Sequence, residues 1–281
     1  MRFPKAKTLL PLLIAATALS RCSCDFFGTT GGLFISEADE EQMGKSFDST
    51  LTLTDSGKTE FPVFAAKSAD SLALQTYVIG LANEVLTSIP KTERPGYPFK
   101  FTLIDKDVEN AFAVPGGYVY IYTGIIKKMQ DESELVGVLG HEIAHVTQHH
   151  YRDAMAKSAA FSLILQALVG DDSKLGQLIG GSLFTLARLQ VSQSNESEAD
   201  FYGTKYEGNT GRNPMGIAKF FSRFEGQGIG SWVSTHPDPP DRVNAVADEV
   251  KKSSKLNSLA ADSATTNFKT RFEQATAVLK K

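Results

Sequence analysis

Cysteine is scarce in this chain, which has two cysteines among 281 residues. These are Cys22 and Cys24, and a disulfide between residues so close together would close a tiny, strained loop that stabilises a fold very little. A disulfide framework is therefore excluded, and a packed core must hold the protein together. The composition permits such a core, because 42% of the residues are hydrophobic and 22% are charged, as in globular proteins.

Neither charge sign dominates, since 29 Lys and Arg residues face 32 Asp and Glu residues, giving a formal net charge of −3. No stretch forms a basic stripe of the kind that neutralises phosphates, so nucleic acid is not expected as a partner. Long-period repeats and extended low-complexity runs are also missing from the sequence. We therefore expect one globular domain over residues 35–281, preceded by short N-terminal additions.

The sequence also lacks an apolar run of the roughly 20 residues that a membrane-spanning helix needs. Residues 8–19 come nearest, but this run is shorter and contains Pro11. Basic residues precede it, and Ala16-Thr17-Ala18 offers the small-x-small pattern of a signal-peptidase site. These features predict a signal segment over residues 1–24, a tether over residues 25–34, and export to the periplasm.

Cys22 has a second interpretation, because residues 19–22 loosely match the lipobox of bacterial lipoproteins. In that pattern the cysteine after the cleavage point is acylated, and its acyl chains tether the protein to a membrane surface. Arg21 stands where the pattern has a small residue. The sequence leaves both an anchored and an unanchored protein open.

Hydrophobic periodicity predicts a small sheet set among helices. Alternating apolar residues predict three strands, over residues 99–103, 110–114 and 118–122. A capping box at Asp131 and Glu134 begins a helix that continues beyond Val146. Further helices are expected over residues 35–47, 70–89, 214–224, 239–252 and 262–280, with a helical hairpin over 159–169 and 175–189.

The helix that begins at Asp131 carries HEIAH, residues 141–145. His141 and His145 are four positions apart, so both imidazoles project from one helical face and can bind one zinc ion. Glu142 lies about 100° around the helix from His141 and can take a proton from water without being a ligand. The pattern predicts a zinc site with Glu142 as the general base.

His149 and His150 follow the motif closely. If the helix continues, His149 lies about 80° around it from His141 and His150 points away from His141. Neither is expected to bind the metal directly, and structural or surface roles are expected for both.

A third ligand is needed, because a catalytic zinc takes three protein ligands and keeps one open position. Glu196 and Asp200 are four residues apart and share a helical face, so one can bind the metal while the other orients a ligand histidine. An ordinary acidic first turn is the alternative. HEIAH upstream favours the metal-binding interpretation.

Four segments together resemble the M48 family of zinc metallopeptidases, in its soluble exported bacterial branch: HEIAH at 141–145, E-x-x-A-D at 196–200, NAFAVPGG at 110–117 and THPDPPDR at 235–242. The resemblance spans residues 35–250. It implies a mainly helical α+β, zincin-like fold with a small β-sheet beside the HEIAH helix. It also implies one Zn²⁺ per chain held by His141, His145 and Glu196. Glu142 would be the general base, and Asp200 would orient a ligand histidine.

The other two matching segments carry further implied roles. Asn110, Ala111, Phe112 and Ala113 resemble the family's strand beside the cleft, which holds an extended peptide by backbone hydrogen bonds; an ordinary strand and turn is the alternative. His236 resembles a family histidine near the metal, which either keeps the enzyme latent as an extra ligand or stabilises the oxyanion. Arg242 is its weaker companion.

The sequence therefore predicts a zinc endopeptidase of the periplasm, and the resemblance implies misfolded cell-envelope proteins as its polypeptide substrates. A latent zinc-binding chaperone or assembly factor with little proteolysis is one alternative. A metal-free structural lipoprotein is another.

Overall fold

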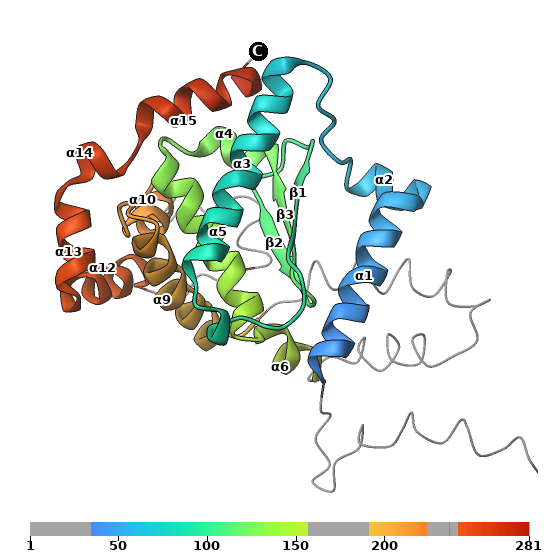
Figure 1. Cartoon of the computed structure of the whole chain (residues 1–281), viewed down its shortest axis with the longest axis horizontal. Helices are drawn as coiled ribbons and strands as arrows, with labels where there is room; N and C mark the ends of the chain where they lie inside the picture. The colour runs from blue at the N-terminus through green and yellow to red at the C-terminus, as the bar shows by residue number, and fades with distance from the viewer. Residues whose placement is uncertain (1–34, 157–190, 224–235, 237–240, 281) are drawn as a thin grey trace, which may run out of the picture. The chain divides into compact units, whose positions relative to one another are not determined.

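The computed structural model describes residues 35–156, 191–223, 236 and 241–280 (Figure 1). The expected signal segment, tether and Cys22, and the expected hairpin over 159–169 and 175–189, lie outside these residues. No helix within the described ranges is long and apolar enough to cross a membrane. The helices are α1 (Glu37–Leu53), α2 (Asp55–Glu60), α3 (Ala69–Ser88), η1 (Lys91–Glu93), α4 (Thr123–Lys128), α5 (Glu132–Thr147), α6 (His150–Ala156), α9 (Gln193–Asn209), α10 (Gly216–Ser222), α12 (Arg242–Lys252), α13 (Ser254–Ala261), α14 (Ser263–Thr266), α15 (Lys269–Thr276) and η2 (Ala277–Lys280).

Three strands form one sheet in the order β1-β3-β2, with bounds Lys100–Ile104 for β1, Ala111–Val114 for β2 and Tyr118–Tyr122 for β3. Strand β1 pairs parallel with β3, and β2 pairs antiparallel with β3. Gly116 and Gly117, both at φ 85°, make the turn between β2 and β3, a backbone conformation that favours glycine. The mainly helical α+β fold and its small sheet are confirmed.

Helix α1 covers one face of the sheet, and α3 and α5 lie on the other side (Figure 1). Phe112 in β2 meets Phe47 of α1 edge to face and stacks on Tyr120 of β3. Because successive side chains of a strand point to opposite faces, Ala111 and Ala113 face away from α1. Their small side chains let β2 approach α5, with which it is in contact.

Helix α5 makes its most extensive contacts with α9. The helices cross where Gly140 meets Gly203: a Cβ on Gly140 would lie 2.9 Å from the carbonyl oxygen of Gly203. Only glycine permits backbones to approach this closely. The crossing brings the HEIAH segment of α5 beside the acidic start of α9.

Helix α5 begins as the sequence predicts, with the Asp131 side chain accepting from the Glu134 N–H at 3.1 Å. The reciprocal bond of the capping box differs. The Glu134 carboxylate accepts from the N–H of Gln130 at 2.8 Å, one residue before the cap. Its other partner is Arg223, which draws the carboxylate away from the cap.

The single helix expected over 262–280 is wrong, because the chain divides there into α14, α15 and η2. The break occurs at Asn267 and Phe268, the latter in the left-handed region at φ 51°. The carbonyl of Asn267 accepts from the Glu132 N–H at 3.1 Å, and its side chain accepts from Lys219 at 2.8 Å. These long-range bonds outweigh the local helical preference.

Candidate metal centre

His141 and His145 lie on the face of α5 that meets α9, and both are fully buried. Their Nε2 atoms are 3.0 Å apart and their rings cross edge to face. Two buried histidines whose Nε2 atoms point to the same place can both bind one metal ion.

Glu196 reaches the same point from the first turn of α9. Its two oxygens lie 3.4 Å from His141 Nε2 and 3.5 Å from His145 Nε2. Glu196 is fully buried, whereas the side chain of Glu198, two residues later, is half exposed. An ordinary acidic first turn would leave Glu196 in solvent, so its burial argues for a site.

His236 completes the cluster. Its Nδ1 is 3.1 Å from Glu196 Oε1 and 3.3 Å from His141 Nε2. One nitrogen or oxygen from each of four buried residues, His141, His145, Glu196 and His236, lies within 4.8 Å of the others.

The spacing of these atoms fits a tetrahedral metal ion. Ligands about 2 Å from a tetrahedral centre are separated by about 3.3 Å. Five atom pairs among these residues, which involve one or the other oxygen of Glu196, lie 3.0 to 3.5 Å apart. The Oε2 atom of Glu196 makes no contact of full hydrogen-bond geometry among the described residues; it lies 3.4 Å from His141 Nε2 and 3.3 Å from the guanidinium of Arg242. Imidazole nitrogens with one carboxylate are a donor set typical of zinc.

Glu142 stands beside the cluster without belonging to it. Its Oε1 is 3.4 Å from His236 Nε2, and within the described ranges neither carboxylate oxygen has a partner with full hydrogen-bond geometry. Burial raises the pKa of Glu142, while the charges of His236 and His141 and the backbone N–H of Ala113 oppose this. A buried carboxylate with a raised pKa beside the candidate metal ligands is suited to proton transfer.

The two histidines of α5 have opposite electrostatic surroundings. Burial lowers the pKa of His141, but its hydrogen bonds to Asp200 and Glu196 outweigh burial and raise the pKa to about 9. Burial and the charge of His141 lower the pKa of His145. For Glu196, burial acts to raise the pKa, yet the charge of His236 and its bond with His141 lower it. The cluster therefore favours an ionised carboxylate.

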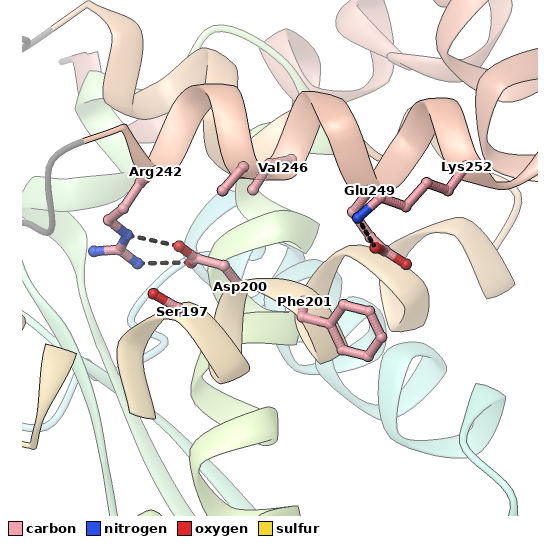
Figure 2. A pocket seen from close by; sticks show the side chains of 8 residues that line it. Ser197, Asp200, Phe201, Arg242, Val246, Glu249 and Lys252 are labelled. Carbon is pink, nitrogen blue, oxygen red and sulfur yellow. Dashed lines mark hydrogen bonds and ion pairs between the residues drawn. The ribbon is translucent and has the colours of Figure 1, made fainter. Parts of the chain in front are cut away.

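Asp200 lies behind His141, one turn along α9 from Glu196. Its Oδ1 is 2.9 Å from His141 Nδ1, and Arg242 of α12 holds both of its oxygens, at 2.7 and 2.6 Å (Figure 2). The third guanidinium nitrogen of Arg242 is 3.3 Å from Glu196 Oε2. Arg242 thus links the two carboxylates of α9, and it packs 4.2 Å over the ring of Phe221.

Strand β2 is an edge strand of the described sheet, and it runs beside Glu142. The carbonyl of Asn110 accepts from Tyr122 N–H of β3. Because backbone direction alternates in an antiparallel pair, Phe112 also faces β3, whereas Ala111 and Ala113 present their backbone groups to the outer edge. Of the four residues proposed to bind a peptide, two are therefore oriented for it.

His150 and Tyr151 are site neighbours that the sequence did not reveal. His150 is buried, and its Nδ1 lies 2.9 Å from His145 Nδ1; a surface position for His150 is wrong. Tyr151 is also buried, with its ring 5.9 Å from that of His145. Burial and the charges of Glu142 and Glu196 raise the pKa of Tyr151, and the Ala113 N–H opposes this.

His149 turns the other way and takes a structural role, one of the two roles expected of it. Its Nδ1 is 2.9 Å from Glu40 Oε2 of α1. Glu40 is buried and also accepts from Arg152 at 2.9 Å. These contacts join α6 to α1, and they do not reach the cluster of His141, His145, Glu196 and His236.

Comparison with known proteins agrees with this geometry. Residues 75–250, more than half of the chain, match the family model for peptidase family M48. The chain belongs to the M48 peptidase family. The buried cluster of this M48 peptidase can thus hold the metal that a metallopeptidase family implies.

Its relatives include bacterial proteins named as proteases. The chain is 29% identical over 261 residues to the beta-barrel assembly-enhancing protease of Escherichia coli, covering 84% of this chain and 51% of that protein. It is 28% identical over 261 residues to the metalloprotease LoiP of Escherichia coli, covering 88% of this chain and 97% of that protein. This M48 peptidase thus spans about half the length of the assembly-enhancing protease and nearly all of LoiP.

Proposed function

We propose that this chain is a zinc-dependent endopeptidase that hydrolyses internal peptide bonds of misfolded cell-envelope proteins. The observation that carries the proposal is the buried cluster of His141, His145, Glu196 and His236 with Glu142 next to it. When bound there, zinc would polarise the substrate carbonyl and lower the pKa of water to about 7.

The protein's own groups supply the remaining chemistry. Glu142 accepts a proton from the attacking water and later donates it to the nitrogen of the leaving amine, which cleaves the peptide bond. Its burial and raised pKa favour this proton exchange. Arg242 and Asp200 hold His141 and Glu196 in place.

The outer edge of β2 is the proposed substrate platform. An extended peptide pairing with the backbone groups of Ala111 and Ala113 would run past Glu142, since the Ala113 N–H faces the Glu142 carboxylate. Binding of this kind uses main-chain hydrogen bonds and suits unfolded polypeptides of varied sequence.

His236 is proposed as a removable fourth ligand that keeps the enzyme latent. Support comes from its Nδ1, which faces Glu196 and His141 at ligand spacing. Stabilisation of the oxyanion is the alternative role for His236. Latency also favours a second candidate function, a zinc-binding chaperone or assembly factor with little proteolysis.

Location in the cell envelope is proposed from two separate sources. The relatives carry the names of a beta-barrel assembly-enhancing protease and a metalloprotease, and residues 1–24 have the features of a signal segment, with Cys22 as a candidate lipid anchor. Unfolded envelope proteins are accordingly the proposed polypeptide partners.

The test pairs metal analysis with proteolysis of casein. Purified protein should contain one zinc per chain, and Glu142→Gln should keep the zinc while losing activity by about 100-fold or more. Glu273→Gln, at an exposed glutamate of α15, is the matched control and should cleave as the wild type does. Zinc-free protein, or cleavage retained by Glu142→Gln, would refute the proposal; binding of unfolded client without cleavage by wild type would favour the chaperone.

A further inference from the structure

His150 lies behind His145, on the side of the ring opposite the ligand cluster. The Nε2 of His145 faces His141 at 3.0 Å, and its Nδ1 faces the Nδ1 of His150 at 2.9 Å. The two rings meet edge to face with centroids 5.0 Å apart. Both side chains are buried, so their facing nitrogens must satisfy each other.

A break in the helix creates this contact. In a continuous helix, a residue five positions after His145 would lie about 140° around the axis and could not reach it. Helix α5 instead ends at Thr147, and His149 adopts the left-handed region at φ 53°. A new helix begins at His150, whose side chain is thereby directed back onto His145.

The contact defines the protonation of both rings when His145 binds a metal through Nε2. Its Nε2 must then carry the lone pair, so the proton sits on Nδ1 and is donated. The Nδ1 of His150 must accept it, which puts the His150 proton on Nε2. That Nε2 lies 3.4 Å from Glu198 Oε2, close enough for electrostatic support although not in hydrogen-bond geometry.

We propose that His150 is a positioning residue of the metal centre, which accepts a hydrogen bond from His145 Nδ1 and so fixes the ring orientation and tautomer of that ligand. This inference rests on the proposed zinc function. His150 performs for His145 the task that Asp200 performs for His141, since each contacts the Nδ1 of its histidine at 2.9 Å. Partners of this kind typically contribute 10- to 100-fold to metal affinity.

Three variants of the full chain test the proposal by competition with a zinc chelator. His150→Phe fills the space without an acceptor and should weaken zinc binding about 10- to 100-fold. His150→Asn places an amide oxygen near the former Nδ1 and should bind zinc more nearly like wild type. His149→Asn, at the neighbouring histidine that contacts Glu40, is the matched control and should leave zinc affinity unchanged.

Equal losses of zinc affinity in His150→Phe and His150→Asn would mean that His150 only packs against His145, and would overturn the proposal. Wild-type zinc affinity in His150→Phe would overturn it as well.

A second measurement needs no variant. In zinc-loaded wild type labelled with ¹⁵N-histidine, NMR should find His145 protonated at Nδ1 and His150 at Nε2; a proton on His150 Nδ1 would overturn the inference. Failure of the proposed function is distinguishable, because wild type itself would then bind no zinc.

Discussion

Helix α5 carries buried acidic groups at both ends, but the two ends neutralise them differently. At its start, buried Glu132 accepts from Arg212 at 2.7 Å, from Arg271 at 2.6 Å and from Tyr77 at 2.5 Å. Burial alone would raise the pKa of Glu132, yet the bonds from Arg271 and Tyr77 and the charge of Arg212 lower it. Permanent cations of the protein balance this end.

At the other end of α5, beside the candidate metal centre, the described residues do not fully neutralise the acidic groups. Three buried carboxylates, those of Glu142, Glu196 and Asp200, lie at this end with one guanidinium, that of Arg242, which contacts Glu196 and Asp200. The other neighbours are histidines, whose charge depends on protonation. A buried cluster with more carboxylates than permanent cations needs bound protons or a metal cation to neutralise its charge. The two ends of α5 therefore differ as a structural ion network differs from a metal centre.

The largest expected effect comes from removing one glutamate at each end. Glu132→Gln leaves Arg212 buried without its full countercharge, and the free energy of unfolding should fall by about 3 kcal/mol with zinc affinity unchanged. Glu196→Gln should instead lower zinc affinity by about 100-fold or more through loss of a ligand. Chemical denaturation and chelator competition on both variants measure the two effects, and the comparison fails if Glu132→Gln releases zinc.

Removing the metal should have a smaller effect on stability, confined to one end. With free zinc at 100 times its dissociation constant, binding adds about 2.7 kcal/mol to the free energy of unfolding. A chelator should therefore lower the melting temperature of wild type and of Glu132→Gln by similar amounts. Glu196→Gln should respond little, and an equal response in that variant would contradict the assigned ligand.

The smallest effect concerns Glu207 of α9, which lies near the start of α5 but outside its ion network. Burial raises the pKa of Glu207 well above its ordinary value, although the backbone N–H of Gly216 opposes this. No group in the described part of the chain reaches its carboxylate with full hydrogen-bond geometry. A raised folded-state pKa favours the fold at low pH, and this contribution is lost as pH rises toward the folded-state value.

Glu207→Gln, which carries no charge, should therefore gain stability over wild type as pH increases above about 4.5. Melting temperatures of both proteins from pH 4 to 8 provide the measurement. A constant difference across this range would mean that Glu207 stays ionised in the fold.

The local features of the site were predictable because they follow from short-range geometry. His141 and His145 share a face in any helix, and the three strands follow from alternation of apolar residues. The position of Glu196 could be inferred because two buried histidines on a helix require a third ligand. What brings it there is the close approach of Gly140 to Gly203, which no local pattern reports.

The remaining features depend on contacts between distant segments. His150 reaches His145 because His149 adopts a left-handed conformation, whereas periodicity alone continues the helix. Asn267 interrupts its helix because it bonds to Glu132 and Lys219. In both places tertiary contacts outweigh the local preference for a helix, so the sequence pattern alone gave the wrong geometry.

Anomalous diffraction at the zinc absorption edge, from crystals of the purified protein, tests the central claim most directly. We predict one anomalous peak per chain, in contact with His141 Nε2, His145 Nε2 and the carboxylate of Glu196. A peak bound elsewhere on the chain, or no peak in protein that cleaves casein, would contradict the account.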